Sequence, residues 1–504
     1  MANAITFDSL FAFAEATIDN HGALFLSAVI LLLSFVFQLR RSSKNNQSFS
    51  SLPPGSLGLP FIGETLHFLN TQRHNMSWKF IDDRLSLYGE VFKTHLIGDP
   101  TICASSPAGN KVLFSGENKL CHVSWPGSVV TVVGKRSLIA LNGEAAKRIR
   151  SAMMTFLRPE ALQAYTGKAD KSVRSFLEEH WQGKSEVKVF PLMKRFAFGI
   201  ACELLMSRYE IEEQEMLEEP FTKMMKGILQ LPIKLPGTRY SQAITAANLL
   251  RSRFQLWIDE RRHKLALGQG SNDEDMLSCL LTYVDENGKP LCDEDIKDNI
   301  LLLLFAGHDT STVVTSMVCR FLALNPDIFD AVYRENNEVL EEKGPNAPLS
   351  WAHIKKLKLS WRVIQEALRM QPPVQGSFRV AIKEFEFSGF RIPKDWKLYW
   401  STNYTHRNAK YFEEPDKFDP SRFEGAGPAP YTFVPFGGGS RMCPGNEFAR
   451  MEALILLHHL VIRFSWTLVD SHEVITVDPM PCPVQGLPIK LVPRISYSGY
   501  HSPS

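Results

Sequence analysis

A single cysteine near the C-terminal end of the chain lies in a glycine-rich stretch that favours a reactive sulfur. Residues 436–445 read FGGGSRMCPG, with Arg441 two positions before Cys443. Glycines let backbone amides point at the sulfur, Arg441 adds positive charge, and a helix expected over residues 451–464, or from Asn446, presents its positive end. These effects predict a thiolate, whose partner is a substrate carbonyl or a metal. No histidine lies in a motif that would make it the paired base of a nucleophile, which favours the metal.

Two other interpretations of these cysteines and glycines are weaker. Glycine-rich loops bind phosphate, but residues 437–439 are not followed by Gly-Lys-Ser or Gly-Lys-Thr. The eight cysteines stand at positions 103, 121, 202, 279, 292, 319, 443 and 482. None is spaced as CxxC, which argues against a zinc ribbon, a thioredoxin motif, a CxxCH haem attachment and a disulfide scaffold. The pattern predicts a reducing compartment, with the other seven cysteines as inert buried thiols.

A long helix is predicted over residues 293–324. It would extend roughly 48 Å, with Asp293 as its cap and Pro326 closing it. Residues 300–306 read ILLLLFA, apolar on every face, which predicts that this segment is buried. The next residues, 307–312, read GHDTST. Acidic and hydroxyl groups are costly inside a buried helix, so they indicate either a satisfied polar layer or an opening where a ligand meets proton-carrying groups.

Composition indicates a large globular protein. Of 504 residues, 44% are hydrophobic and 22% charged, which excludes a disordered or collagen-like chain. The net charge of +2 provides no global field toward nucleic acid, so no nucleic-acid partner is expected. We expect a mainly α fold with small β-sheets over residues 64–504, as one unit, although the length suggests about three domains. Helices are expected over 143–157, 160–180, 192–207, 241–267, 293–324 and 451–464, and strands over 90–94, 385–392 and 397–400.

The N-terminal part of the chain predicts a membrane anchor. Residues 22–39 contain no charge and would extend about 27 Å as a helix, close to the hydrocarbon thickness of a bilayer. Lys and Arg are absent before this run and follow it from Arg40, which argues against a cleaved signal peptide and places the following chain in the cytoplasm. We therefore expect a lumenal N-terminus over 1–21, a single transmembrane helix over 22–39, a linker with a Pro-rich hinge over 40–63, and a catalytic domain over 64–504.

Several motifs together resemble one enzyme family. Residues 436–445 match the FxxGxRxCxG signature of the haem-thiolate cytochrome P-450 monooxygenases, and residues 306–311, AGHDTS, look like the oxygen-activating [AG]Gx[DE]T[TS] motif of that family. Residues 366–369, EALR, are similar to its ExxR pair, and residues 420–423, PSRF, to its PxRF segment. These motifs occur in the order of the family, behind an anchor and a proline hinge. The resemblance covers essentially the whole chain and implies the cytochrome P-450 fold.

The resemblance also implies a cofactor and its contacts. It makes the Cys443 thiolate the axial ligand of the iron of haem b (iron protoporphyrin IX), a ligand that donates electron density and favours O–O cleavage. Further cofactor-binding positions implied by it are Phe436, Arg441, Arg379 and Arg150. The three arginines would pair with haem propionates. Four residues before Arg150 the family usually has Trp or His, whereas this chain has Ala146, so one expected propionate donor is missing.

Two further groups of residues acquire roles from the same resemblance. Glu366, Arg369 and Arg422 would form a buried charged triad behind the cysteine loop, where removing one member leaves a buried charge unpaired. Asp309 and Thr310 would be the proton-delivery pair, because oxygen bound at the haem must receive protons while the site otherwise stays dry.

The resemblance predicts a monooxygenase that uses O₂ and electrons from a membrane-bound NADPH-cytochrome reductase, in the endoplasmic reticulum membrane. Lys147, Arg148 and Arg450 are basic residues that could dock an acidic reductase, although charged residues are more often a solvated face. A haem-thiolate isomerase or dehydratase, which needs neither O₂ nor reductase, is the alternative. The cysteine loop without insertion and the Asp309-Thr310 pair favour the monooxygenase. A non-catalytic lipid- or haem-binding protein is a more distant possibility.

Short sequence segments outside the main motifs narrow the expected substrate class. Residues 425–439 and 392–400 look like the plant clan of terpenoid and steroid oxidases, and residues 477–481 and 486–490 resemble its pentacyclic-triterpenoid oxidase branch, the beta-amyrin 28-monooxygenase-like proteins. We therefore expect an amyrin- or lupeol-type triterpene as substrate, with a taxane diterpenoid or a steroid-like compound as the alternative. Candidate pocket residues lie in apolar segments that could equally be core: Trp125, Leu302, Ala306, Val374 and Val484. Ser440, Asn446 and Phe448 depart from the residues common in triterpenoid oxidases, near the haem rather than in the pocket.

Overall fold

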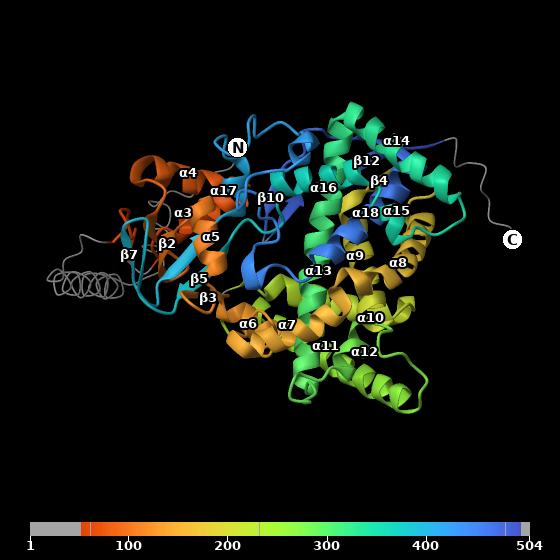
Figure 1. Cartoon of the computed structure of the whole chain (residues 1–504), viewed down its shortest axis with the longest axis horizontal. Coiled ribbons are helices and arrows are strands. Elements are labelled where there is room, and N and C mark those ends of the chain that lie inside the picture. Colours follow the sequence, from red (N-terminus) through yellow and green to blue (C-terminus); the bar gives the residue numbers. More distant parts are fainter. Residues whose placement is uncertain (1–51, 61, 231, 479, 495–504) are drawn as a thin grey trace, which may run out of the picture.

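The structure is a computed structural model, and it describes residues 52–60, 62–230, 232–478 and 480–494. The expected transmembrane helix over 22–39, the lumenal segment before it and most of the linker lie outside the described residues, so they stay predictions. Within the described residues helices dominate and the strands form small sheets, as expected (Figure 1).

Helix α13 (Asp293–Leu324) runs through the middle of the molecule, with other helices packed around it (Figure 1). It has the predicted bounds, but its cap differs from the prediction. Cys292 is the N-cap, and its backbone N–H donates to the carboxylate of Asp295 at 3.2 Å. Asp293, the predicted cap, is the first helical residue and pairs instead with Arg262 at 2.6 Å. The Asp295 carboxylate, two residues beyond Asp293, reaches back to the free N–H of Cys292. The sequence pattern alone did not distinguish which of these acidic residues caps the helix.

The remaining helices follow in chain order. The N-terminal half of the chain contains α3 (Thr65–Arg73), α4 (Ser77–Tyr88), α5 (Pro107–Ser115), α6 (Gly127–Val133), α7 (Gly143–Leu157), α8 (Pro159–His180), α9 (Val189–Met206), α10 (Ile211–Gly227) and α11 (Arg239–Ala266). The C-terminal half contains α12 (Met276–Thr282), α14 (Pro326–Lys343), α15 (Trp351–Ile354), α16 (Lys358–Met370), α17 (Thr402–Arg407) and α18 (Asn446–Arg463), with short 3-10 helices η2 (Pro420–Phe423) and η3 (Gly439–Arg441).

The largest sheet has five strands in the order β1-β2-β8-β5-β3. These strands are β1 (Phe92–Leu96), β2 (Asp99–Cys103), β3 (Cys121–Ser124), β5 (Ser377–Ala381) and β8 (Lys397–Trp400). β2 and β8 are parallel, while the other neighbours pair antiparallel, with Val123 of β3 opposite Arg379 of β5. This register brings residues more than 250 positions apart in the chain to one edge of the sheet.

Smaller sheets complete the strand content. They comprise a three-stranded sheet of β4 (Glu186–Lys188), β12 (Pro488–Pro493) and β9 (Phe464–Leu468), and two hairpins, β6 (Phe385–Phe387) with β7 (Phe390–Ile392) and β10 (Ile475–Val477) with β11 (Pro481–Pro483). The single strand expected over 385–392 is therefore two strands, because Ser388 and Gly389 both have positive φ and form a tight turn between them.

The main hydrophobic core lies around α13 and the helices packed on it, and a second cluster lies under the five-stranded sheet. Among the described helices, α13 is the one long and apolar enough to cross a membrane by length and composition. However, 56% of its apolar window is buried inside the molecule. Its apolar surface thus belongs to the core, which explains why an 18-residue apolar window occurs so far from the N-terminus.

Candidate active site

One face of α13 stays open along the middle of the helix. Residues Leu303, Ala306, Gly307, Thr310 and Val314 are exposed or half-buried, whereas most residues around them are buried. Their spacing of three or four places them on a single helix face. A Cβ built on Gly307 would meet no atom within 4 Å beyond the helix's own backbone, so open space lies beside the helix. The expected burial of 300–306 is confirmed for residues 300–302 and 304, but it is wrong for Leu303 and Phe305, which are half-buried, and for Ala306, which is exposed on this face.

Thr310 presents its hydroxyl on this open face. Its Oγ1 donates to the carbonyl oxygen of Ala306 at 2.6 Å, one turn earlier in the helix. Such a bond holds the side chain against the backbone and draws the carbonyl away from its regular helical partner. The small residues Ala306 and Gly307 leave room beside the hydroxyl, so a ligand can approach the helix at this turn.

Asp309 extends in a different direction, toward α9. Its Oδ1 lies 2.7 Å from Nδ1 of His308 and 3.5 Å from Nζ of Lys194. Burial alone would raise the pKa of Asp309, but His308 and Lys194 together hold it below its ordinary value, so the carboxylate is charged. Thr310 and Asp309 are adjacent, as the motif requires, but the carboxylate is tied to α9 while the hydroxyl lies on the open face.

Glycines shape the loop that carries Cys443. Gly437 and Gly439 have φ of +69° and +66°, a region that other residues rarely adopt. A Cβ on Gly438 would lie 2.4 Å from Cδ2 of Phe114, and a Cβ on Gly439 would lie 2.1 Å from the Phe114 carbonyl oxygen. The loop therefore packs tightly against the end of α5. Its closure is fixed by a backbone hydrogen bond of 2.9 Å from Cys443 N–H to the Phe436 carbonyl.

The environment of Cys443 differs from the sequence-based expectation of a low pKa. Burial raises the pKa of its thiol, while the amide of Gly445 and the charge of Arg150 lower it, and the net direction is upward. Arg441, the expected source of positive charge, is turned to other partners. In the protein alone, desolvation outweighs the nearby amide and charge. A coordinating metal deprotonates a thiol outright, so the raised pKa does not argue against thiolate ligation.

The three arginines near the cysteine loop have distinct surroundings. Arg150 on α7 donates through Nη1 to the Met442 carbonyl at 2.7 Å, directly beside Cys443. Arg379 on β5 is buried and lies 3.3 Å from Glu117. The guanidinium of Arg441 donates to Glu117, to the carbonyls of Leu138 and Leu141, and to the side chain of Asn142. Glu117 thus joins two of the arginines, and it belongs to no motif that sequence reasoning could have used.

The predicted triad of Glu366, Arg369 and Arg422 is present. Glu366 and Arg369 are fully buried on α16, with Arg369 Nε 2.7 Å from Glu366 Oε2, and Arg422 Nε lies 3.3 Å from Glu366 Oε1. Glu366 also accepts from the backbone N–H of Asp419 at 2.9 Å. The triad therefore connects α16 to the chain segment that leads into the cysteine loop.

A histidine extends this connection. Arg369 Nη1 donates to the carbonyl of His406 on α17, at 2.9 Å, and His406 Nε2 accepts from the backbone N–H of Val434 at 2.9 Å. Burial lowers the pKa of His406 to about 3, so its ring is neutral and can accept this bond. The triad and His406 together fix the residues just before Phe436, which is itself half-buried beside the loop.

The donor set around Cys443 fits haem. Among the described residues, no group of three or more His, Cys, Asp or Glu side chains could hold a bare metal ion. A metal bound by Cys443 must therefore arrive with most of its ligands, as the iron of a porphyrin does. Three arginines, from α7, β5 and the cysteine loop itself, lie near the cysteine loop and suit the carboxylates of such a group.

Comparison with known proteins decides the family. The model of the family described as Cytochrome P450 matches residues 53–491. The chain belongs to the cytochrome P-450 family. It is therefore an oxidoreductase of the monooxygenase kind, with a haem-thiolate cofactor, and its fold is the family fold. The FxxGxRxCxG and [AG]Gx[DE]T[TS] resemblances are thereby confirmed at the level of the family.

Similar P-450 proteins include plant enzymes and a solved bacterial structure. The chain is 46% identical to the beta-amyrin 28-monooxygenase of Kalopanax septemlobus, over 93% of this chain and 98% of that protein. It is 45% identical to the beta-amyrin 28-monooxygenase of Vitis vinifera, over 94% of this chain and 98% of that protein. The retinoic acid-bound cyanobacterial CYP120A1 superposes with a TM-score of 0.80 at 34% identity, covering 88% of this chain and 99% of that one.

The candidate pocket residues of this P-450 lie in different environments. Ala306 is on the open face of α13, while Leu302, one turn earlier, is buried in the main core. Val374 and Val484 are 37% and 63% exposed, and Trp125 is half-buried against the main core. Ala306, Val374 and Val484 thus present exposed surface, whereas Leu302 is covered by the residues of the main core.

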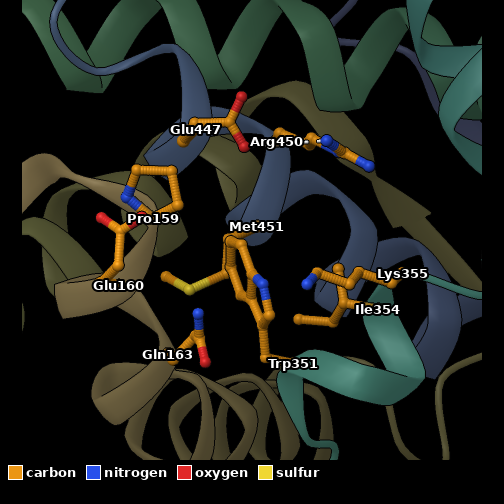
Figure 2. A pocket seen from close by; sticks show the side chains of 9 residues that line it. All are labelled: Pro159, Glu160, Gln163, Trp351, Ile354, Lys355, Glu447, Arg450 and Met451. Atoms are coloured by element: carbon orange, nitrogen blue, oxygen red, sulfur yellow. Dashed lines mark ion pairs between the residues drawn. The ribbon is translucent and has the colours of Figure 1, made fainter.

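A separate cavity of about 210 Å³ lies beside α18, the helix that follows the cysteine loop (Figure 2). Its walls come from α8, α15 and α18, and the residues that line it are Pro159, Glu160, Gln163, Trp351, Ile354, Lys355, Glu447, Arg450 and Met451. Arg450 pairs with Glu447 at 3.7 Å and lies over the ring of Trp361. None of the five candidate pocket residues lines this cavity, so it is distinct from the open face of α13.

The three basic residues considered for reductase docking differ in their availability. Arg148 is held by Asp285 at 2.8 Å and by the carbonyls of Lys289 and Pro290, so its charge is already used within the molecule. Lys147 is exposed and makes a loose 3.6 Å pair with Glu144. Lys147 therefore keeps more freedom to meet a partner than Arg148 does, while Arg450 is half-buried over Trp361 and paired with Glu447.

Proposed function

We propose that the chain is a membrane-anchored P-450 that hydroxylates or further oxidises a polycyclic terpenoid, specifically a pentacyclic triterpene of the amyrin or lupeol type. The similarity to beta-amyrin 28-monooxygenases over nearly their whole length carries this proposal. The open face of α13, with Thr310 beside two small residues, supports it because a large rigid substrate needs space at that turn.

Haem b is the proposed cofactor, with Cys443 as the protein ligand of its iron and Phe436 beside it. Arg150, Arg379 and Arg441 are the proposed propionate partners, of which Arg150 and Arg379 make fewer internal hydrogen bonds than Arg441. When bound, haem supplies the reductive activation of O₂ and the transfer of one oxygen atom to a C–H bond. Glu366, Arg369 and Arg422 support the cysteine loop from behind.

Protons are proposed to reach the open face through Asp309 and Thr310. Lys194 is 45% exposed, so its ammonium connects Asp309 Oδ1 with solvent. Asp309 would transfer protons through water to Thr310, and Thr310 Oγ1 would donate them to oxygen on the open face. The apolar wall of α13 keeps other water away, which protects the reaction from unwanted proton delivery.

Substrate binding is proposed to rest on apolar burial, because an amyrin- or lupeol-type triterpene offers few polar groups. Burial contributes about 25 cal/mol per Å² of apolar surface. Trp125, Ala306, Val374 and Val484 are the proposed contacts, with Leu302 behind them. The C–H bond that sits nearest the iron is the one oxidised.

The membrane location and topology of the enzyme are proposed from the N-terminal sequence. Residues 22–39 anchor the chain in the endoplasmic reticulum membrane, residues 1–21 are lumenal, residues 40–63 form the linker and hinge, and the catalytic domain over 64–504 faces the cytoplasm. Electrons come from NADPH-cytochrome reductase, which docks near Lys147 and Arg450 on the cysteine side. Acid groups on the reductase would complement these cations.

The experiment is coexpression with a plant NADPH-cytochrome reductase in yeast strains that make β-amyrin, α-amyrin or lupeol, with extracts profiled by mass spectrometry. New oxygenated triterpenes support the proposal and report which carbon is oxidised. A strain that makes taxadiene tests the alternative, because products only there would assign the enzyme to diterpenoids. Products that form without reductase would favour an isomerase or dehydratase. If no product forms, a carbon monoxide difference spectrum tests whether the haem-thiolate is intact.

A further inference from the structure

Three distant segments of the chain converge on one buried carboxylate, that of Glu117. Its side chain is 2% exposed. Oε1 lies 3.0 Å from Nε of Arg441, and Oε2 lies 3.3 Å from Nε of Arg379. Oε1 also accepts from the backbone N–H of Val123 at 3.2 Å. The carboxylate thus meets both arginines by the same atom of the guanidinium group.

The fold explains why these segments meet. Glu117 follows α5 by two residues, and the glycines of the cysteine loop allow that loop to pack on Phe114 at the end of α5, which brings Arg441 to Glu117. Val123 of β3 pairs with Arg379 of β5, so the strand that bonds to Glu117 also carries Arg379 alongside it. The juxtaposition is built by two independent contacts rather than by one flexible side chain.

The charged side chains around Glu117 and the cysteine loop leave a net positive charge that matches a ligand with two negative charges. Arg150, Arg379 and Arg441 carry three positive charges near the cysteine loop, and Glu117 carries one negative charge. Of the other titratable groups, His122 lies 4.0 Å from Glu117. Burial lowers the pKa of Arg379, while Glu117 raises it, so the carboxylate stabilises the charged guanidinium in a desolvated place. The remaining two positive charges equal the two propionates of haem b.

We propose that Glu117 is a positioning residue for the haem pocket, which fixes Arg379 and Arg441 by their Nε atoms and retains the cofactor through them. This inference rests on the proposed haem role of the two arginines. Arg379 keeps Nη2 for a propionate, because its Nε forms an ion pair with Glu117 at 3.3 Å and its Nη1 donates to the Phe378 carbonyl. Arg441 is held at both ends, which makes it a strut between the cysteine loop, Glu117 and residues 138–142.

The test compares the haem-loaded parent enzyme with Glu117→Gln and Glu117→Asp. Gln has the same shape but no charge, and Asp keeps the charge on a shorter side chain. The two measurements are the rate of haem transfer to excess apomyoglobin and the midpoint potential of the ferric/ferrous couple. We expect Glu117→Gln to lose haem about tenfold faster or more, because it leaves two buried arginines poorly paired. Its potential should rise, since a negative charge near the cofactor is removed.

Asp275→Asn is the matched control. Asp275 is also fully buried and lies 2.7 Å from an arginine, Arg261, but outside the haem pocket. We expect it to leave haem transfer and potential as in the parent. Glu117→Asp should keep the parent potential and lose haem at an intermediate rate, and it carries the test if Glu117→Gln does not fold.

Three outcomes overturn the inference. Slower haem loss in Glu117→Gln would mean that the carboxylate competes with the propionates for the arginines. Equal behaviour of Glu117→Gln and the parent would mean that Glu117 has no role toward haem, and equal defects in Asp275→Asn would mean a general packing effect. A parent enzyme that binds no haem would instead contradict the proposed function itself, which separates the two failures.

Discussion

The hydroxyl of Ser311 donates a 2.7 Å hydrogen bond to the carboxylate of Glu452, which ties α13 to α18 through two buried side chains. Ser311 follows Thr310 on the packed side of α13, and Glu452 lies on the helix that follows Cys443. The helix that bears the open face and the helix that extends the cysteine loop are therefore joined directly. The other carboxylate oxygen of Glu452 is among the buried polar atoms without a hydrogen-bond partner in the described residues.

We predict that Glu452 makes stability depend on pH. Burial raises the pKa of Glu452 to about 7 from 4.5, although the bond from Ser311 lowers it. Between these values the folded chain holds a proton that the unfolded chain releases, so the stabilising effect is complete below pH 4.5 and is lost as the pH rises toward 7. The free energy of unfolding should fall by an amount on the order of 3 kcal/mol over this pH range. Glu452→Gln should flatten the fall of Tm between pH 5 and 8.

The measurement is thermal unfolding of the haem-loaded enzyme at several pH values. Glu447→Gln, on the same helix but half-exposed, should keep the slope of the parent. A slope in Glu452→Gln as steep as that of the parent would show that another group titrates in this range.

Glu366→Ala should yield protein that does not retain haem. The substitution leaves Arg369 and Arg422 without their carboxylate and frees the N–H of Asp419, at a cost of about 3–5 kcal/mol. The ratio of haem absorbance to total protein measures the effect. Glu342→Ala removes a carboxylate from an exposed pair with Lys356 and should retain haem fully. Recovery of fully loaded Glu366→Ala enzyme would refute the supporting role of the triad.

Thr310→Ala should separate NADPH consumption from product formation. Without the hydroxyl on the open face, reduced oxygen is released as peroxide, and product per NADPH should fall about tenfold or more. Thr310→Ser should restore much of the coupling because it keeps the hydroxyl. Thr312→Ala removes a similar bond, 2.8 Å to the His308 carbonyl, but on the packed face, and should leave the coupling ratio unchanged. Equal coupling in Thr310→Ala and the parent would disprove the role of Thr310.

Gly439→Ala should destabilise the cysteine loop more than its backbone conformation alone requires. A residue with a Cβ at φ of +66° costs roughly 1–2 kcal/mol, and here the Cβ would also collide with the Phe114 carbonyl. Gly425→Ala is the matched control, since Gly425 has φ of +58° but open space around it. The Tm of Gly439→Ala should therefore lie below that of Gly425→Ala, and equal values would contradict the tight packing of the loop on α5.

Local patterns predicted local structure well. The bounds of α7, α13 and β8 agree with the sequence-based ranges, because periodicity and end signals lie within each segment. β1 begins two residues later than predicted, since strand ends depend on the partner strand. The motif residues Glu366, Arg369 and Arg422 meet as predicted, because the resemblance carries three-dimensional information that a single sequence does not.

Other contacts depend on the packing of distant segments and left no signal in the sequence. Lys194, which pairs with Asp309, lies on α9 more than 100 residues away, and Glu117 lies in no motif. Whether the pKa of Cys443 is raised or lowered also depends on how deeply the thiol is buried. The glycines and Arg441 in the sequence do not indicate that burial. Leu302 is buried and Ala306 is exposed although both lie in one apolar run one turn apart, because burial depends on the segments that pack against each turn of α13.

The bond between His406 and Val434 has a consequence for biosynthesis. Together with Arg369 it joins α16, α17 and the residues leading to the cysteine loop using protein groups alone. These hydrogen bonds involve protein groups only, so we expect this part of the chain to fold before haem binds, with the Cys443 loop already supported. We expect cells short of haem to accumulate a compact, protease-resistant chain, which later addition of haem converts to active enzyme without new translation.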